Sequence, residues 1–134
     1  MTDEAQPKKE EEKHSVMLVD DDKFLLDMYS MKFVQAGYAV HSCFSVEEAI
    51  GKLRSGITPD VILFDVTMPI EDGFALLQKV RDEKLAPKAK LIALTNSDND
   101  KPRAEAFGIT RYVIKATMIP SEVVNMVKEV LAAK

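Results

Sequence analysis

Short apolar runs alternate with amphipathic stretches from Ser15 to the end of the chain. The runs cover residues 16–19, 38–43, 61–64, 91–94 and 112–114, and most are apolar throughout rather than at every second position. A strand covered on both faces has this pattern, because its successive side chains point to opposite faces and both faces are buried. The runs therefore predict the strands of a parallel sheet.

The stretches between the runs have helical spacing, with apolar residues at three- and four-residue intervals through residues 25–36, 46–53, 76–80 and 123–131. Asp22 and Asp72 are expected to cap two of these helices at the N-terminus. Ser45 is expected to cap another, with Glu48 three residues later as its capping-box partner. Pro102 fits only the first turn of a helix, so the helix after the fourth strand is expected to be short.

Strictly alternating strands and helices predict an α/β fold with a parallel sheet and helices on both faces. Right-handed crossovers leave few topologies for five such units. At this length the expected arrangement is a doubly wound, flavodoxin-like sheet of five strands in the order 2-1-3-4-5. Ligands of such sheets bind beyond the carboxyl ends of the strands, at the point where the strand order reverses.

Length and composition fit one domain of 134 residues with an apolar core. Residues 1–14 are charged and lack apolar periodicity, so we expect a disordered leader before a folded domain at 15–134. The net charge of −4 argues against direct nucleic-acid binding. Cys43 is the single cysteine, expected to be a small buried apolar residue, and no signal peptide or membrane span is visible. These features predict a cytoplasmic protein that does not bind a membrane.

Polar residues that could bind a metal or take part in a reaction end four of the predicted strands. The first strand ends in Asp20 and Asp21, the third in Asp65, the fourth in Thr95 and the fifth in Lys115. In the predicted strand order these ends share one edge, and the first and third strands are neighbours. Three carboxylates brought together repel one another unless a cation joins them. Because the available ligands are oxygens, with no His or Cys cluster, we expect Mg²⁺ held by Asp20 and Asp21 beside Asp65.

A divalent cation, an ammonium and a hydroxyl around one carboxylate form a pocket for a phosphoryl group. Phosphoryl transfer is catalysed mainly by positioning and charge neutralisation. Asp65 is the expected nucleophile, since it stands between the other groups and a carboxylate can form an acyl phosphate. Lys115 would bind one phosphoryl oxygen as a point charge, and the Thr95 hydroxyl would donate a hydrogen bond to another.

These residues also resemble the signature of the response-regulator receiver domain, the CheY-like family. The matching motifs are LVDDD at residues 18–22, DVTMP at 65–69 followed by DG at 72–73, LT at 94–95, and YVIK at 112–115. The resemblance covers residues 15–133. It implies that Asp65 is the phosphoacceptor, that Asp20 and Asp21 bind the metal, and that the backbone carbonyl of Thr67 is a further metal ligand.

The resemblance also implies a switch and its partners. Thr95 would be the switch hydroxyl, Tyr112 the switch aromatic, and Lys115 the lysine of the family's site. A sensor histidine kinase or a phosphotransfer protein would donate the phosphoryl group. The face built from the fourth helix, the fifth strand and the fifth helix would then dock to a protein target, which the sequence does not name.

Two features depart from the family pattern. Family members usually follow the lysine with proline, often through a cis bond, whereas Ala116 follows Lys115 here. Without proline a cis bond costs roughly 3–4 kcal/mol, so we expect this bond to be trans, or cis under strain. The segment from Thr95 to Lys115 is also shorter than is common, which predicts a remodelled docking face.

Three readings compete. The first is a switch that catalyses only its own phosphorylation and dephosphorylation, and so is not an enzyme acting on other molecules. The second is a degenerate receiver that works as a phosphorylation-independent interaction module. The third is a phosphohydrolase with an aspartate nucleophile, disfavoured because Thr67 stands where haloacid-dehalogenase-like enzymes have a second acid. No output domain follows Lys134 in this sequence, so we expect action through docking to another protein.

Overall fold

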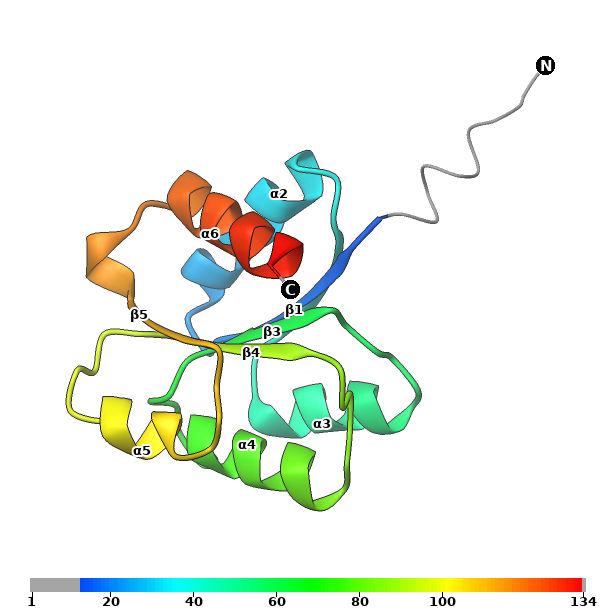
Figure 1. Ribbon diagram of the computed structural model, residues 1–134, viewed down its shortest axis with the longest axis vertical. Helices are drawn as coiled ribbons and strands as arrows, with labels where there is room; N and C mark the ends of the chain where they lie inside the picture. Colours follow the sequence, from blue (N-terminus) through cyan, green and yellow to red (C-terminus); the bar gives the residue numbers. More distant parts are fainter. Residues whose placement is uncertain (1–12, 134) are drawn as a thin grey trace.

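The computed structural model describes residues 13–133, which form one parallel sheet with helices on both faces (Figure 1). The strand order is β2-β1-β3-β4-β5, which confirms the predicted doubly wound α/β fold. The predicted leader at residues 1–14 lies outside the described residues apart from Lys13 and His14. The elements in chain order are β1 (Ser15–Val19), α2 (Lys23–Gln35), β2 (Ala39–Cys43), α3 (Val46–Arg54), β3 (Val61–Phe64), α4 (Gly73–Asp82), β4 (Lys90–Thr95), α5 (Lys101–Glu105), β5 (Arg111–Ile114), the 3₁₀ turn η1 (Lys115–Thr117) and α6 (Pro120–Ala132).

Two apolar layers enclose the sheet. Figure 1 shows α2 and α6 on one face and α3, α4 and α5 on the other. Alternate residues of each strand enter opposite layers: Val16 and Leu18 pack toward α2 and α6, whereas Met17 and Val19 pack toward α3 and α4. This division explains why the strands read as continuous apolar runs, since both faces of the sheet are buried.

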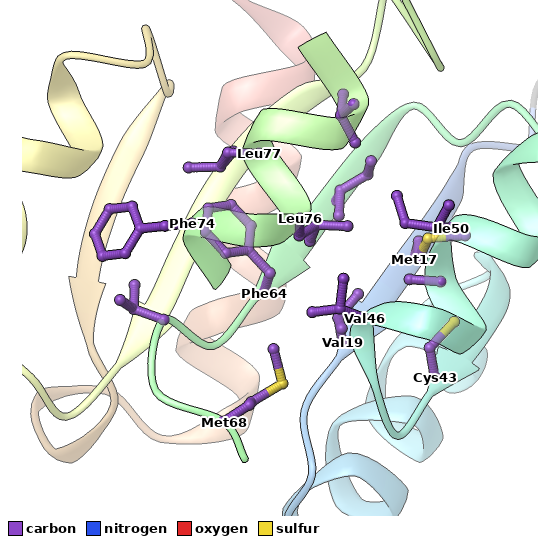
Figure 2. Packing of buried hydrophobic residues seen from close by; sticks show 14 of the residues in the cluster. Met17, Val19, Cys43, Val46, Ile50, Phe64, Met68, Phe74, Leu76 and Leu77 are labelled. Carbon is purple, nitrogen blue, oxygen red and sulfur yellow. The ribbon is translucent and has the colours of Figure 1, made fainter. Parts of the chain in front are cut away.

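Figure 2 shows the layer on the α3 and α4 side. Met17 and Val19 of the sheet face Val46 and Ile50 of α3, and Phe64 packs beside Leu76 of α4. Helical spacing places these side chains on the inner face of each helix. The layer fixes α3 and α4 against the strands whose carboxyl ends carry the predicted site.

The first turns of three helices are fixed by the predicted caps. The Asp22 carboxylate accepts from the Leu25 backbone N–H at 3.1 Å, and the Asp72 carboxylate accepts from the Phe74 and Ala75 N–H groups. The Ser45 hydroxyl accepts from the Glu48 N–H at 3.0 Å. The Glu48 carboxylate binds the Phe44 N–H, one residue before the position that the capping-box pattern predicts. The Asp22 and Ser45 caps begin α2 and α3 shortly after β1 and β2 end, whereas the Asp72 cap begins α4 after a longer loop that follows β3.

The fourth helix, α5, has five residues and carries Pro102 in its first turn, which confirms the short helix expected from the sequence. The 3₁₀ turn η1 follows β5 directly and begins at Lys115. All peptide bonds of the described residues are trans, including the bond between Lys115 and Ala116. Within residues 13–133, no helix combines the length and apolar character needed to cross a membrane.

Candidate functional site

The carboxyl ends of β1 and β3 bring two acidic residues side by side. Val19 of β1 pairs with Phe64 of β3, and the next residues are Asp20 and Asp65. The Asp65 N–H continues this pairing by donating to the Val19 carbonyl at 2.9 Å. The Asp20 N–H likewise donates to the Cys43 carbonyl at the end of β2, at 3.1 Å. The backbone of both acids is therefore held by the sheet, and only their side chains extend beyond it.

The site contains the buried polar and charged residues of the described chain. They are Asp20, Asp65 and Thr95, with exposed fractions of 6%, 8% and 0%. Burying an ionised carboxylate is unfavourable unless hydrogen bonds and an opposite charge accompany it. The surroundings of Asp20 and Asp65 must therefore supply both.

Lys115 provides the opposite charge to both acids. Its Nζ lies 2.6 Å from Asp20 Oδ2 and 2.7 Å from Asp65 Oδ2, and its side chain is 8% exposed. A single ammonium therefore bridges two carboxylates that come from different strands. Lys115 therefore reaches both carboxylates although Ala116, rather than proline, follows it.

Backbone N–H groups bind the other oxygen of each carboxylate. Asp20 Oδ1 accepts from the Asp22 N–H at 2.9 Å, and Asp65 Oδ1 accepts from the Thr67 N–H at 3.0 Å. Hydrogen bonds to an ionised acceptor are stronger than neutral ones. Each carboxylate is thus held at both oxygens, which fixes the direction of the Asp65 side chain.

The pKa values of Asp20 and Lys115 both lie above their ordinary values. Burial raises the pKa of Asp20, although the hydrogen bond from Lys115 acts in the opposite direction. Burial also lowers the pKa of Lys115, but hydrogen bonds and charge from Asp20 and Asp65 outweigh it, so the pKa of Lys115 lies above its ordinary value. Lys115 is therefore an ammonium at neutral pH.

The acids also have the composition of a divalent-cation site. One carboxylate oxygen from each of Asp20, Asp21 and Asp65 lies within 4.8 Å of the others, and Asp21 is exposed. Together with the Lys115 ammonium the site carries a formal charge of −2, which a divalent cation would balance. Oxygen ligands with one side open to water suit Mg²⁺, which keeps several of its own waters. The residues present therefore fit the cation that the sequence predicts.

Gly73 allows the loop after β3 to fold back against Asp65. The Gly73 N–H donates to the Val66 carbonyl at 2.9 Å. A Cβ at position 73 would lie 2.6 Å from the Asp65 carbonyl oxygen and 2.8 Å from Val66 Cα, distances that real side chains do not reach. Only glycine permits this approach without a shift of the backbone, so residue 73 helps to define the position of Asp65.

Thr95 and Tyr112 meet at Ser97, in the loop between β4 and α5. The Thr95 hydroxyl accepts from the Ser97 N–H at 3.3 Å, while the Tyr112 hydroxyl donates to the Ser97 carbonyl. Thr95 ends β4 at the same edge of the sheet as Asp65, and Tyr112 lies half-buried in β5. The two predicted switch residues are therefore linked through one loop residue.

Sequence reasoning did not identify the hydrogen-bonding roles of Ser97 and Asn96. The Asn96 side chain accepts from the Ala116 N–H at 3.1 Å, which joins the loop after Thr95 to the turn that begins at Lys115. The sequence shows only that Asn96 and Ser97 directly follow the carboxyl end of β4. Polar residues at such a place are common, and their partners depend on loop geometry that no sequence period describes.

Comparison with known proteins gives the family. The sequence model of the response regulator receiver domain matches residues 16–128, most of the chain. This chain belongs to the response regulator receiver family. Receiver domains are components of two-component signalling. The family match therefore agrees with the resemblance that the sequence motifs indicate.

The receiver domain has relatives among curated proteins and solved structures. The probable transcriptional regulator ycf27 of Cyanidium caldarium is 32% identical over 108 residues, covering 81% of this chain and 43% of the relative. The chain spans about half the length of the curated relatives it matches. A CheY-like receiver domain protein from Methanospirillum hungatei superposes with a TM-score of 0.80 at 25% identity, covering 90% of this chain and 94% of that one. Response regulator TrrA from Thermotoga maritima, solved in complex with Mg²⁺–BeF, has a TM-score of 0.74 at 25% identity and covers 87% of this chain and 97% of that one.

Proposed function

We propose that this receiver domain accepts a phosphoryl group on Asp65 in a Mg²⁺-dependent reaction. The observation that supports this proposal best is the arrangement around the Asp65 carboxylate. Lys115 binds one oxygen at 2.7 Å, the Thr67 N–H binds the other at 3.0 Å, and oxygens of Asp20 and Asp21 lie within 4.8 Å of an Asp65 oxygen. A nucleophile held this firmly beside a cation site needs little rearrangement before it reacts.

The reaction transfers the phosphoryl group from nitrogen to oxygen. One carboxylate oxygen of Asp65 attacks the phosphorus of a phosphorylated nitrogen, such as that of a histidine. The P–N bond breaks, its electron pair stays on the nitrogen, which takes up a proton from water, and a new P–O bond completes an acyl phosphate. Lys115 binds an oxygen of the transferred group, and Thr95 donates its hydroxyl hydrogen to another.

The metal ligands in this proposal are Asp20, Asp21, Asp65 and the backbone carbonyl of Thr67. When bound there, Mg²⁺ supplies neutralisation of the charge that the transferred phosphoryl group brings. The complex of TrrA with Mg²⁺–BeF supports the assignment by likeness of fold and family. The Asp22 and Thr67 N–H groups already orient the carboxylates of Asp20 and Asp65. Asp21 is exposed, so its side chain is the one of the three that can change its orientation when the metal binds.

The output follows from the link at Ser97. When the Thr95 hydroxyl moves toward the phosphoryl group, the Ser97 N–H loses its acceptor, and Tyr112, bound to the Ser97 carbonyl, changes position with the loop. The face formed by α5, β5 and α6 then presents a different surface to a protein target. We infer that a sensor histidine kinase or a phosphotransfer protein is the donor, in the cytoplasm, where the single Cys43 would stay reduced.

Intact-mass measurement with phosphoramidate as donor tests the proposal. With Mg²⁺, wild type should gain the mass of one phosphoryl group, and a chelator of the metal should prevent the gain. Asp65→Asn should gain nothing, because the nucleophilic carboxylate is gone. Asp27→Asn is the matched control, since Asp27 is an exposed acid of α2. This variant should gain one phosphoryl group on Asp65, as wild type does.

Three results would contradict the proposal. A wild type that binds Mg²⁺ but gains no phosphoryl group would favour a phosphorylation-independent interaction module. Repeated turnover of a generic phosphate ester, dependent on Asp65, would favour a phosphohydrolase. A single gain of mass that survives in Asp65→Asn would place the acceptor on another residue.

A further inference from the structure

A side-chain hydrogen bond joins the residue that follows Thr95 to the residue that follows Lys115. The Ala116 N–H donates to Asn96 Oδ1 at 3.1 Å. Asn96 directly follows Thr95, and Ala116 directly follows Lys115. The backbone pairing between β4 and β5 ends at Thr95 and Ile114, so the Asn96 side chain continues the connection one step beyond the ladder.

This bond depends on the residue at position 116. Proline, the residue that usually follows the lysine in this family, has no backbone N–H and therefore could not make it. Proline would instead restrain the turn through its fixed φ. In this chain Ala116 lacks that restraint, yet Lys115 Nζ still lies 2.6 Å and 2.7 Å from its two carboxylate partners.

Two other hydrogen bonds restrain the turn η1, and both stay within residues 114–118. The Thr117 hydroxyl donates to the Ile114 carbonyl at 2.8 Å, and the Met118 N–H donates to the Lys115 carbonyl at 3.3 Å. These contacts shape the turn but do not fix it relative to β4. The bond from Asn96 does, because its acceptor belongs to the loop that follows β4.

We propose that Asn96 is a positioning residue that fixes the start of η1 and so directs the Lys115 ammonium toward Asp20 and Asp65. Asn96 replaces, with a hydrogen bond from outside the turn, the restraint that a proline would provide inside it. The same bond ties Lys115 to Thr95, so a movement of the Thr95 loop is transmitted to the turn that carries Lys115. The effect of Asn96 on phosphorylation rests on the proposed function, whereas its effect on Lys115 does not.

NMR of the full chain without any phosphodonor tests the structural part. Asn96→Ala should speed the hydrogen exchange of the Ala116 amide by about two- to tenfold, the factor expected for one neutral hydrogen bond. Exchange of the Met118 amide, bonded within the turn, should stay as in wild type. The Lys115 ¹⁵Nζ signal should broaden or disappear as the ammonium becomes less firmly held. Asn96→Asp retains an acceptor oxygen and should restore protection of the Ala116 amide.

A double-mutant cycle tests the functional part. With saturating Mg²⁺ and phosphoramidate, Asn96→Ala should slow phosphorylation of Asp65 by about two- to tenfold. In the Ala116→Pro background the donor N–H is absent, so Asn96→Ala should have no further effect. Asn99→Ala is the matched control, since Asn99 is an exposed amide of the same loop and should leave the rate unchanged.

The outcomes separate this proposal from the proposed function. Unchanged exchange of the Ala116 amide in Asn96→Ala overturns the proposal, as does faster exchange with an unchanged Lys115 signal. Equal effects of Asn96→Ala in both backgrounds overturn it too, because Asn96 would then act without Ala116. If the wild type accepts no phosphoryl group, the proposed function fails, and the NMR results alone decide the role of Asn96.

Discussion

At the scale of single residues, Lys115 determines how two buried acids coexist. Its ammonium bridges Asp20 and Asp65 by contacting the Oδ2 atom of each carboxylate. A divalent cation attracted to the same carboxylates must therefore share them with Lys115. We therefore expect Lys115 to stabilise the fold when no metal is bound and to compete with a metal that binds these carboxylates.

Lys115→Gln should therefore have opposite effects on stability and on metal affinity. Without Mg²⁺, its free energy of unfolding should fall by roughly 3 kcal/mol, because two nearly buried carboxylates lose their counter-charge. Added Mg²⁺ should stabilise the variant more than wild type, since the site becomes more negative by one charge. Denaturant unfolding with and without Mg²⁺ measures both effects.

Lys128→Gln is the control for the loss of a lysine, because Lys128 is exposed on α6. It should respond to Mg²⁺ as wild type does. If Mg²⁺ raised the free energy of unfolding equally in wild type and Lys115→Gln, Lys115 and the cation would not compete for the carboxylates.

The positions of the site residues could be predicted, but their hydrogen bonds could not. Asp20, Asp65 and Lys115 are predictable because each ends an apolar run, and parallel strands bring such ends to one edge. The bonds from the Thr67 N–H to Asp65 and from the Ala116 N–H to Asn96 depend on the path of loop backbones. Hydrophobic periodicity carries no information about that path.

At the scale of elements, the predicted boundaries are close to the observed ones, and the differences have local causes. The second apolar run begins at Tyr38, whereas β2 begins at Ala39. The Tyr38 N–H still closes the end of α2 by donating to the Phe33 carbonyl, and the two rings pack edge to face 5.1 Å apart. The apolar character of Tyr38 therefore serves the helix end, which a strand pattern does not distinguish.

Helices α3 and α4 each contain a glycine, and alanine should have opposite effects at the two positions. In Gly73→Ala the new Cβ meets the Asp65 carbonyl at 2.6 Å, so the start of α4 must shift. The variant should lose about 1–3 kcal/mol of stability, as overpacked sites do. It should also accept phosphoryl groups more slowly, because the loop beside Asp65 moves.

Gly51→Ala is the matched control in α3, where a Cβ would meet nothing within 4 Å. Alanine is the better helix former, so this variant should gain about 0.5–1 kcal/mol and keep the wild-type phosphorylation rate. Denaturant unfolding of both variants checks the signs. Equal changes at the two positions would mean that the close approach at Gly73 is relieved without cost.

At the scale of the whole molecule, Cys43 reports on the integrity of the layer between the sheet and α3. The side chain is fully buried at the end of β2, beside Val46 and Ile50, as the sequence predicted for a small apolar residue. Burial raises the pKa of the Cys43 thiol to about 11. The folded chain therefore keeps a neutral thiol at a pH where the unfolded chain has already lost the proton.

This difference should make part of the stability depend on pH in the alkaline range. Below the ordinary thiol pKa both states are protonated, and Cys43 contributes no pH dependence. Between pH 9 and pH 11 the unfolded state binds fewer protons than the folded state, so the free energy of unfolding falls as pH rises. Relative to Cys43→Ala, the free energy of unfolding of wild type should fall by about 2–3 kcal/mol across this range.

Equilibrium unfolding of wild type and Cys43→Ala from pH 8 to pH 11 measures the effect. Other groups that titrate, such as lysines and tyrosines, act equally in both proteins and cancel in the difference. Alanine leaves a small cavity, which offsets the two curves by a constant amount but does not change their slopes. Curves that stay parallel to pH 11 would mean that the thiol ionises as readily in the folded chain. The layer between β2 and α3 would then have to open to water as a unit without the rest of the molecule unfolding.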